Sequence, residues 1–525
     1  MSVVRCACCF GFLLWYGAVL SGQQIPTELI YEWRSTSLHA KGLRELGSGR
    51  RIADQVFLAT YPDAQTAATA LNQLRVHPDV RAVQYNFQVE FRKTPNDPDY
   101  FRQLNMQRAG FEAAWDVTTG GVTAEGHAIV TAVLDGGFDT DHEDLVENIW
   151  TNAVEVPNDG LDNDGNGYID DLNGWNFVGS SPEHPSDTHG TAVAGLLGAR
   201  GNNSLGVAGT NWDARLMLFT ISTVADIISA YQYVIDQRAS FNRSGGTEGA
   251  FVVSTNASFG IEGATCEEFP VWGAMYDRLG EVGVLTAASV ANVDRDADRA
   301  GDMPVDCPSD FLIGVTNVDD DDGLFPSSGY GRTNVDLAAP GERSYTTRPN
   351  NGYGSFGSTS AAAPYVTGAV SLLYSLTTCT DLLRASRSDP ARVARRMRET
   401  ILASVRPGRD LADRTVTGGI IAVGAAVNLL QASCAPQPQQ LAIQKIYPNP
   451  SAGTVKVQTN QRTLPADLKI RLIDVLGRAA RIPGYRQATG EPGTLIVDLS
   501  GMAAGVYTLV VEHGGRTAFT KLILL

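Results

Sequence analysis

Several features that mark common classes of protein are missing from this sequence of 525 residues. It has no strongly basic run, and 41 Lys and Arg stand against 57 Asp and Glu, for a net charge of −16. Nucleic acid is therefore not expected as a partner. With 43% hydrophobic and only 19% charged residues, the composition also excludes wholesale disorder.

Long apolar runs are scarce. The run at the N-terminus follows Arg5, extends from Cys6 to Leu20 and ends at the small residues Ser21 and Gly22. It is too short to span a bilayer comfortably and has the build of a secretory signal peptide over residues 1–22. No transmembrane segment is expected, and no cysteine follows the small residues to carry a lipid anchor.

Cysteine is scarce as well. Three of the seven cysteines lie in the predicted signal peptide, which leaves Cys266, Cys307, Cys379 and Cys434 in the exported chain. An even number in an oxidising compartment favours two disulfides over free buried thiols. Three pairings are open, and we favour Cys266 with Cys307 and Cys379 with Cys434 because each pair is close in sequence.

Composition divides the rest of the chain into three parts and a linker. Residues 23–95 combine strand-like and helix-like segments in a small mixed module, and the turn-rich TPNDPDY (94–100) marks its boundary. Residues 96–433 form the main block, and CAPQPQQ (434–440) is a linker by composition. Residues 441–525 carry short alternating strands, typical of a small β-sandwich.

The main block alternates apolar runs with helix-like segments. Runs expected of strands buried on both faces occupy residues 128–134, 214–221, 250–259, 282–289 and 312–318. Helices are expected at about 190–199, 225–240 and 359–376. This alternation predicts an α/β domain with a mostly parallel sheet flanked by helices, whose ligands bind beyond the carboxyl ends of the strands.

Three polar residues stand where such a domain places its active site. Asp135 directly follows the apolar run AIVTAVL, His189 opens a helix-like segment, and Ser360 begins another. A serine hydroxyl becomes a nucleophile when an imidazole takes its proton, and the imidazole needs an acceptor that fixes its tautomer. Taken singly, each residue has a simpler explanation as a cap, a turn residue or a structural histidine.

In combination, the segments around these residues resemble the three signatures of the subtilisin-like serine proteases. They read AVLDGGFDTDHEDL, DTHGTAVAGLLGA and GSTSAAAPYVTGA, in the order Asp, His, Ser. The resemblance covers residues 96–433 and implies a subtilisin-like fold and an endopeptidase that acts on polypeptides. It implies Ser360 as nucleophile, His189 as base and Asp135 as its orienter, with no redox or organic cofactor required.

The same resemblance points to the groups around this triad. Asn292 in LTAASVANVD is the expected side-chain donor to the oxyanion, and Asn256 is the alternative. Ser258, Phe259 and Gly260 resemble the strand that lines the primary specificity pocket, where the backbone pairs with an extended substrate.

Three positions depart from the family pattern. The Gly two places before the nucleophile is Ser358, the Met after it is Ala361, and the second His of HGTH is Ala192. None of these changes removes a catalytic group. The rival hypothesis is a catalytically silent surface protein that uses the cleft for binding or adhesion. An α/β-hydrolase is disfavoured, because no GxSxG motif surrounds Ser360.

One calcium candidate comes from loop spacing. In DNDGNGYIDD, the spacing of an EF-hand loop is carried by Asp162, Asp164, Asn166 and Asp170. Position twelve is Asn173 instead of Glu. A weak calcium site and a solvated, Asx-rich loop are both open.

A second calcium candidate comes from the family resemblance. It implies Asp144 and Asn203 as ligands, with the carbonyls of Leu205 and Val207 less secure. The acidic run at 319–322 is expected to be only a solvated turn.

The flanking modules resemble two further elements. Residues 23–95 resemble the inhibitor-like propeptide of the family, which covers the cleft until it is cleaved. YPNPSAG (447–453), LIDVLGR and the final GVYTLVVEHGGRTAFTKLILL resemble the sorting domain of proteins exported by type IX secretion. This implies the type IX machinery as a partner, passage through the periplasm of a Bacteroidetes-type bacterium, and release or surface attachment.

Overall fold

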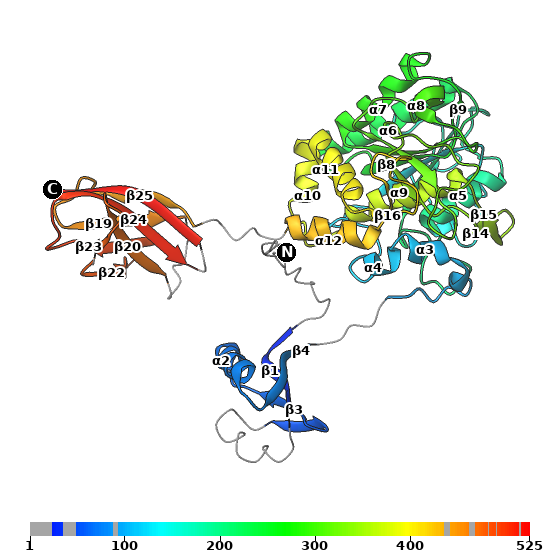
Figure 1. The fold of residues 1–525 in the computed structure, drawn as a ribbon. Coiled ribbons are helices and arrows are strands. Elements are labelled where there is room, and N and C mark those ends of the chain that lie inside the picture. Colours follow the sequence, from blue (N-terminus) through cyan, green and yellow to red (C-terminus); the bar gives the residue numbers. More distant parts are fainter. Residues whose placement is uncertain are drawn as a thin grey trace, which may run out of the picture. The chain divides into compact units, whose positions relative to one another are not determined.

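The computed structural model describes residues 24–34, 49–87, 93–434, 441–460, 468–480, 482–489, 491–513 and 516–525. The predicted signal peptide (1–22) and most of the predicted linker (434–440) lie outside these residues. The chain divides into two compact units, Met1–Lys93 and Thr94–Leu525 (Figure 1). None of the described helices combines the length and apolar character that a membrane crossing needs.

The first unit is a small α+β module. Its antiparallel sheet has the order β2-β3-β1-β4 and consists of β1 (Gln24–Trp33), β2 (Arg50–Ala53), β3 (Val56–Thr60) and β4 (Val80–Phe87). Helix α2 (Ala64–Val76) begins after Asp63, whose carboxylate accepts a hydrogen bond from the Thr66 N–H at 2.7 Å. Leu71 and Leu74 of α2 pack with Trp33 and Phe57 of the sheet in one apolar core.

The second unit is built on a nine-stranded sheet with the order β16-β17-β13-β12-β10-β8-β5-β7-β6. All neighbouring strands are parallel except β16 and β17. In that order the strands are Arg406–Pro407, Gly419–Ile420, Leu337–Ala339, Leu312–Asn317, Leu285–Ser289, Val252–Ala257, Val130–Asp135, Arg215–Thr220 and Gly174–Asn176. The predicted parallel sheet is thus confirmed, and each of the five predicted strands lies in it.

Helices cover both faces of this sheet (Figure 1). They are α3 (Leu104–Arg108), α4 (Phe111–Trp115), α5 (Thr188–Gly198), α6 (Val224–Ser244), α7 (Pro270–Val282), α8 (Ala297–Ala300), α9 (Thr359–Leu373), α10 (Leu382–Ser388), α11 (Pro390–Leu402) and α12 (Val423–Cys434). Neighbouring strand residues point to opposite faces. Val253 therefore packs in the core of α9, α11 and α12, whereas Val252 packs in the core of α6 and α7.

Two short antiparallel pairs lie outside the large sheet. Strand β9 (Ile261–Glu262) pairs with β11 (Asp302–Met303), and β14 (Ser344–Arg348) pairs with β15 (Gly352–Phe356), both antiparallel.

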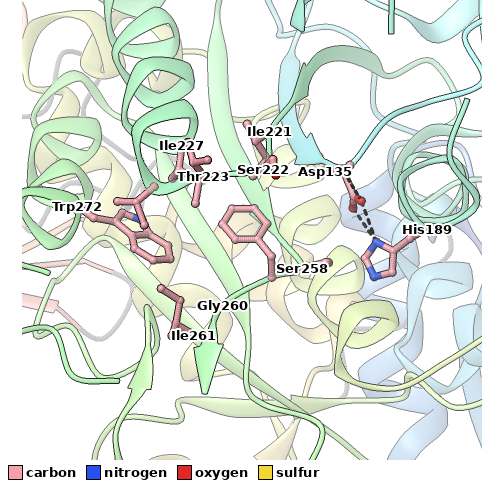
Figure 2. Close-up of a pocket in the computed structure, with 13 residues that line it drawn as sticks. Asp135, His189, Ile221, Ser222, Thr223, Ile227, Ser258, Gly260, Ile261 and Trp272 are labelled. Atoms are coloured by element: carbon pink, nitrogen blue, oxygen red, sulfur yellow. Dashed lines mark hydrogen bonds and ion pairs between the residues drawn. The ribbon is translucent and has the colours of Figure 1, made fainter. Parts of the chain in front are cut away.

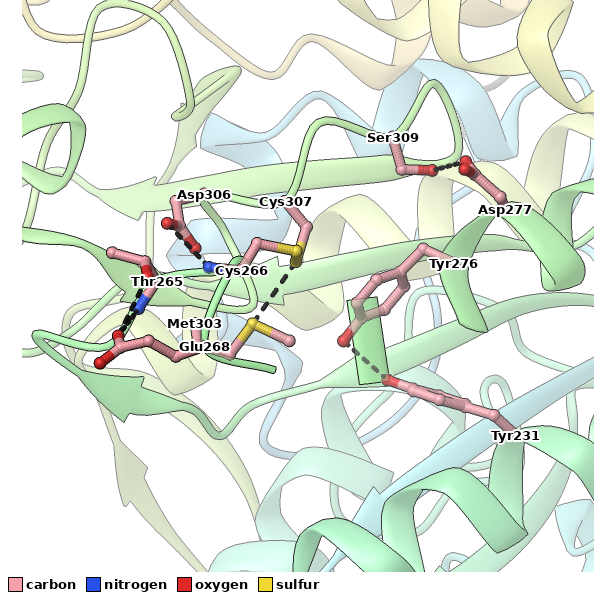
Figure 3. The surroundings of a disulfide bond; sticks show 10 residues. All are labelled: Tyr231, Thr265, Cys266, Glu268, Tyr276, Asp277, Met303, Asp306, Cys307 and Ser309. Atoms are coloured by element: carbon pink, nitrogen blue, oxygen red, sulfur yellow. Dashed lines mark hydrogen bonds between the residues drawn. A yellow bond between two sulfur atoms is a disulfide. The ribbon is translucent and has the colours of Figure 1, made fainter. Parts of the chain in front are cut away.

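The favoured disulfide pairing is confirmed, with Cys266 bonded to Cys307 and Cys379 to Cys434. The first bond joins the segment that enters α7 to the segment that follows β11. Figure 3 shows how the Cys266 N–H also donates to the Asp306 carboxylate, at 3.1 Å. A Cβ at Gly273 would come within 2.4 Å of the Cys266 sulfur, so α7 packs directly on this bond.

The prediction that residues 319–322 form only a solvated turn is wrong. Asp322 accepts hydrogen bonds from Arg406, at 2.5 and 2.9 Å, and from Arg108, at 2.9 Å. These bonds, with Arg406 contributing most, outweigh burial and lower the pKa of Asp322 to about 2. The turn therefore ties helix α3 to the edge strand β16.

The C-terminal residues form the predicted β-sandwich. Its antiparallel sheets have the orders β18-β19-β23-β22 and β21-β20-β24-β25. The strands are β18 (Ile443–Tyr447), β19 (Thr454–Thr459), β20 (Lys469–Asp474), β21 (Ala479–Ala480), β22 (Gly484–Gln487), β23 (Thr494–Asp498), β24 (Gly505–His513) and β25 (Arg516–Leu524). Val455 and Val497 of one sheet share a core with Leu472 and Leu509 of the other.

Candidate active site

Asp135 and His189 meet at the carboxyl end of the parallel sheet (Figure 2). Asp135 is the last residue of β5, and its carboxylate is only 6% exposed. His189 Nδ1 lies 2.9 Å from each carboxylate oxygen, and the Gly136 N–H donates to one of them at 2.8 Å. This geometry fixes the imidazole with Nδ1 toward Asp135 and leaves Nε2 directed away from it.

Two features of helix α5 bring His189 to this position. Asp187 is the N-cap, and its carboxylate accepts hydrogen bonds from the His189 and Gly190 N–H groups at 2.7 and 3.0 Å. Gly190 lets the helix approach β5, because a Cβ there would lie 2.1 Å from the Gly137 carbonyl oxygen. Asp187 was missed in the sequence, although an Asp just before a helix-like segment is an N-cap signal.

The surroundings of His189 favour its protonated form. Burial opposes protonation, but the hydrogen bond and charge of Asp135, followed by the charge of Asp187, raise the pKa of His189 above its ordinary value. The ring also meets the edge of Phe356, with centroids 5.2 Å apart. Asp135 is thus arranged to stabilise an imidazolium that forms during a reaction.

Ser360 begins helix α9 and is tied to Ser258, which follows β8. The Ser258 hydroxyl donates to the Ser360 carbonyl at 2.9 Å, and the Ser360 hydroxyl donates to the Ser258 carbonyl at 3.4 Å. Pro364 has no N–H for that Ser360 carbonyl, so Ser258 replaces the missing helical bond. Among the described hydrogen bonds, none joins Ser360 to His189.

The structure separates the two asparagine candidates. The carbonyl oxygen of Asn292 accepts hydrogen bonds from the Thr359 N–H at 3.1 Å and from the Thr359 hydroxyl at 2.8 Å. Its NH₂ group has no partner among the described residues, and it lies beside the start of α9. Asn256 is fully buried. Its NH₂ group donates to the Ser258 hydroxyl, and its carbonyl oxygen accepts a hydrogen bond from the Thr367 hydroxyl. Asn292 therefore presents an NH₂ group without a described partner, whereas the amide of Asn256 is enclosed in the core.

A pocket of about 300 Å³ opens beside His189. Asp135, His189 and Ser258 line one end (Figure 2). Ile227, Ile261 and Trp272 lie on the opposite side with Thr223 (Figure 2), and Ile221, Val224 and Phe259 add further apolar surface to the wall. The predicted Phe259 and Gly260 thus lie in the wall, and the Phe259 ring stacks on Trp272 at 6.3 Å. The pocket suits an apolar side chain next to a polar reaction centre.

Ser358, which stands where the family has Gly, adopts a strained backbone conformation. Ser358 has φ 66° and ψ −172°, a region that is essentially reserved for glycine. A residue with a Cβ in that region carries strain of about 1–3 kcal/mol. Its N–H is held by a 3.0 Å hydrogen bond to the Glu342 carboxylate. The strained residue lies two positions before Ser360. The replacement of Gly by Ser at this position does not remove a catalytic group.

Hydrogen bonds within the EF-hand-like loop involve all four predicted residues. Asp162 accepts hydrogen bonds from three backbone N–H groups within the loop, and Asp170 accepts from the Asp159 and Gly160 N–H groups. Asp164 and Asn166 do lie together, because the Asn166 amide donates to the Asp164 carboxylate at 3.1 Å. Asp162 lies with them, because the Asn166 N–H donates to the carboxylates of both Asp162 and Asp164, at 3.1 and 3.0 Å, whereas Asp170 caps backbone N–H groups at the start of the loop.

The residues of the second calcium candidate do lie together. The Asn203 amide donates to the fully buried Asp144 carboxylate at 2.8 Å, and the Val207 N–H donates to it at 2.9 Å. Asp97, only 4% exposed, accepts from the Asn202 N–H at 2.7 Å and was missed in the sequence. Burial, with a smaller contribution from the charge of Asp97, raises the pKa of Asp144 to about 7.

Comparisons with known proteins agree with this geometry. Residues 126–428 match the model of the Subtilase family, and residues 445–525 match a secretion system C-terminal sorting domain, which indicates secretion or surface attachment.

Two curated relatives and one solved structure illustrate the similarity. Subtilisin-like protease 1 of Plasmodium falciparum is 29% identical over 270 residues, which cover 46% of this chain and 37% of the relative. Thermitase of Thermoactinomyces vulgaris is 29% identical over 310 residues, 57% of this chain and 91% of that protein. A protease structure from Pseudoalteromonas arctica is 24% identical, covers 64% of this chain and 100% of its own, and has a TM-score of 0.47. The chain thus spans less than two fifths of the first relative.

Proposed function

The chain belongs to the subtilase family, and we propose that it is a secreted serine endopeptidase that cleaves polypeptides through an acyl-enzyme on Ser360. The observation that carries this proposal is the pairing of the buried Asp135 carboxylate with His189 Nδ1 at 2.9 Å. That pairing leaves Nε2 as the base, at the end of a pocket that Ser258 also lines. Ser258 in turn holds the Ser360 backbone at 2.9 Å.

Acylation needs one local rearrangement. The Ser360 hydroxyl leaves its weak 3.4 Å hydrogen bond to the Ser258 carbonyl and turns to His189. Its oxygen then attacks the substrate carbonyl carbon while His189 Nε2 takes the proton. The carbonyl oxygen becomes an oxyanion, which the Asn292 NH₂ group and the N–H groups at the start of α9 stabilise.

Collapse of this intermediate breaks the C–N bond. His189 returns the proton to the leaving amine and is again neutral, with Asp135 still bound at Nδ1. A water molecule then gives a proton to His189 and attacks the acyl carbon. When the ester bond breaks, Ser360 takes the proton back and the acid product leaves.

A fluorophosphonate probe tests this assignment directly. Reaction of the serine oxygen with the phosphorus needs the same proton transfer to His189, so we expect covalent labelling at Ser360. Labelling is measured by mass spectrometry on the secreted, processed protein. A Ser360→Ala variant should lose the label completely.

Ser355→Ala provides the matched control, because Ser355 lies five residues earlier and is exposed. It should label like the parent protein. The rival function is a catalytically silent surface adhesin on the same scaffold. The observation in its favour is that no described hydrogen bond joins Ser360 to His189. A processed protein that never labels would favour that rival and reject the protease.

The apolar part of the pocket predicts a preference for large apolar side chains. Burial of one such side chain contributes about 2 kcal/mol, so selectivity over alanine should exceed tenfold in kcat/KM. Phe259→Ala should reduce that selectivity about tenfold in cleavage of a peptide library. Val271→Ala is the control, because Val271 precedes Trp272 but is 63% exposed. Unchanged selectivity in Phe259→Ala would reject this subsite.

We infer a structural calcium ion at the second candidate site. Asp97 and Asp144 are buried carboxylates, and neither takes part in a described salt bridge. Buried carboxylates need a counter-charge, and oxygen donors favour calcium. Asp97, Asp144 and Asn203 would hold the ion, which links the start of the second unit to the loop after α5.

The flanking parts fit an export pathway. We propose residues 1–22 as signal peptide, 23–95 as an inhibitor-like propeptide, 96–433 as catalytic domain, 434–440 as linker and 441–525 as sorting domain. The family match at 445–525 supports type IX secretion from a Bacteroidetes-type bacterium, through the periplasm, with release or surface attachment.

A further inference from the structure

The turn that precedes Ser360 is bound by a carboxylate that the catalytic steps do not use. Glu342 Oε1 accepts hydrogen bonds from the Ser358 N–H at 3.0 Å and from the Asn317 side-chain NH₂ group at 2.7 Å. Asn317 is fully buried at the end of β12. Glu342 is half-buried and takes part in no described salt bridge, so its described side-chain partners are both neutral donors.

The segment that carries Glu342 is itself fixed. The Asn317 side-chain oxygen accepts a hydrogen bond from the Gly341 N–H at 2.7 Å. A Cβ at Gly341 would overlap the Ser358 carbonyl oxygen, so the two segments pack without room for a side chain. The Glu342 carbonyl oxygen accepts a hydrogen bond from the Asn105 side-chain amide, also at 2.7 Å. Both the backbone and the carboxylate of Glu342 therefore have defined positions.

This contact falls on a residue that needs outside support. Ser358 has its positive φ in a region that is essentially limited to glycine, and such strain persists only where surrounding contacts impose it. The next N–H, that of Thr359, is bound by the Asn292 side-chain oxygen at 3.1 Å. The Ser360 N–H that follows has no partner among the described hydrogen bonds. Two acceptors thus hold successive peptide groups just before the nucleophile.

We propose that Glu342 is a positioning residue for the nucleophile and acts through the Ser358 N–H. The proposal rests on the assignment of Ser360 as nucleophile. It adds that the Glu342 oxygen compensates for the serine that replaces glycine at position 358. Without this hydrogen bond, the turn relaxes toward backbone conformations that serine prefers, and the Ser360 hydroxyl and N–H shift with it. A displacement of about 1 Å from the reactive geometry costs about a hundredfold in rate.

Substitutions that separate the reach of the side chain from its charge test the proposal. Glu342→Ala removes the acceptor, so it should lower kcat for a peptide substrate about a hundredfold and change KM less than about threefold. Glu342→Gln keeps an oxygen at the same reach and should recover most of the lost rate. Glu342→Asp keeps the charge on a side chain one carbon shorter and should remain close to Glu342→Ala.

The strained residue provides a second arm of the test. Ser358→Gly removes the Cβ that makes this backbone conformation costly. In that background, Glu342→Ala should lower kcat by no more than about tenfold, because glycine adopts the turn without support. A loss of the same size in both backgrounds would show that Glu342 does not act through the conformation of Ser358, and it overturns the proposal.

The rate of labelling by the fluorophosphonate probe separates two kinds of failure. If the parent protein does not label at Ser360, the protease assignment is rejected, and this proposal with it. If the parent labels and Glu342→Ala labels at the same rate, only the positioning role is rejected. Asp321→Ala is the matched control, because Asp321 is an exposed carboxylate four residues after Asn317. It should label and turn over substrate like the parent.

The melting temperature distinguishes positioning from a general loss of stability. All rates are compared at a temperature at which every variant is folded. A rate in Glu342→Gln as low as in Glu342→Ala would mean that the acceptor oxygen is not what matters, and that result also overturns the proposal. If Glu342→Ala does not fold, the comparison of Glu342→Asp with Glu342→Gln carries the same expectation.

Discussion

Asp135→Asn should lower kcat/KM for a peptide substrate by about 10⁴. Both carboxylate oxygens lie 2.9 Å from His189 Nδ1, so they accept the Nδ1–H and stabilise the imidazolium. An Asn side chain has one acceptor oxygen and one NH₂ group. When the NH₂ group faces Nδ1, it favours the tautomer with the proton on Nε2, and His189 then has no lone pair for the Ser360 proton.

The same variant should move the acidic limb of the pH profile. His189 acts as a base only when neutral, and Asp135 raises the pKa of His189. As the pH falls, the parent should therefore lose activity at a higher pH than it would if His189 had its ordinary pKa. Removal of the Asp135 charge lowers that pKa, so the residual activity of Asp135→Asn should fall only at a lower pH.

Asp141→Asn is the matched control, because Asp141 lies on the same loop and is exposed. It should retain the parent kcat/KM and pH profile. The melting temperature of both variants shows whether the fold is intact. Retention of more than a tenth of the activity in a folded Asp135→Asn would contradict the role assigned to Asp135.

The pairing of Asp135 with His189 was accessible from the sequence because it depends on strand and helix ends. Asp135 ends an apolar run and His189 begins a helix, and parallel strands bring such ends to one edge of the sheet. The role of Ser258 was not accessible. Its hydroxyl bonds the Ser360 carbonyl because Pro364 lacks an N–H, and this requires the tertiary approach of β8 to α9.

Several outer strands of the sheet were also hidden in the sequence. Strands β6, β13 and β17 contain only two or three residues each, too few for a periodic pattern to be recognised. They form through pairing with neighbours, as Trp175 of β6 does with Phe219 of β7.

The acidic loop shows what the spacing of residues leaves open. An EF-hand pattern presumes one loop conformation, whereas here Asp162 and Asp170 cap backbone N–H groups. Glu155 precedes the motif and joins Asp164 and Asp171 only because the chain folds back on itself. The local pattern therefore located the cluster of acidic residues, and the contact of Glu155 with that cluster came from the tertiary structure.

A buried arginine carries the largest expected effect on stability. Arg238 of α6 is completely enclosed, and burial lowers its pKa to about 10. Its guanidinium donates to the carbonyls of Val252, Gly283 and Ser386, at 2.5, 3.4 and 3.2 Å. It also lies over the Phe251 ring, 4.2 Å from the centroid. One side chain thus joins α6, the start of β8, the end of α7 and α10.

Arg238→Met should reduce the free energy of unfolding of the catalytic unit by about 4 kcal/mol. Methionine fills similar space but loses the hydrogen bonds to three carbonyls and to the Asn242 side-chain oxygen. A hydrogen bond that involves a charged group contributes about 1.5–3 kcal/mol. Arg238→Lys should also be destabilising, because a lysine lacks the planar fork that reaches several carbonyls at once. Urea unfolding followed by tryptophan fluorescence, on full-length protein inactivated by Ser360→Ala, measures the difference.

Arg243→Met is the control on the same helix, since Arg243 is exposed and takes part in no described salt bridge. It should change stability by less than about 0.5 kcal/mol. If Arg238→Met unfolds at the same urea concentration as Arg243→Met, the hydrogen bonds of Arg238 do not hold these elements together. If Arg238→Met unfolds at a much lower urea concentration, the guanidinium helps to hold α6 in place. Helix α6 in turn forms one wall of the substrate pocket.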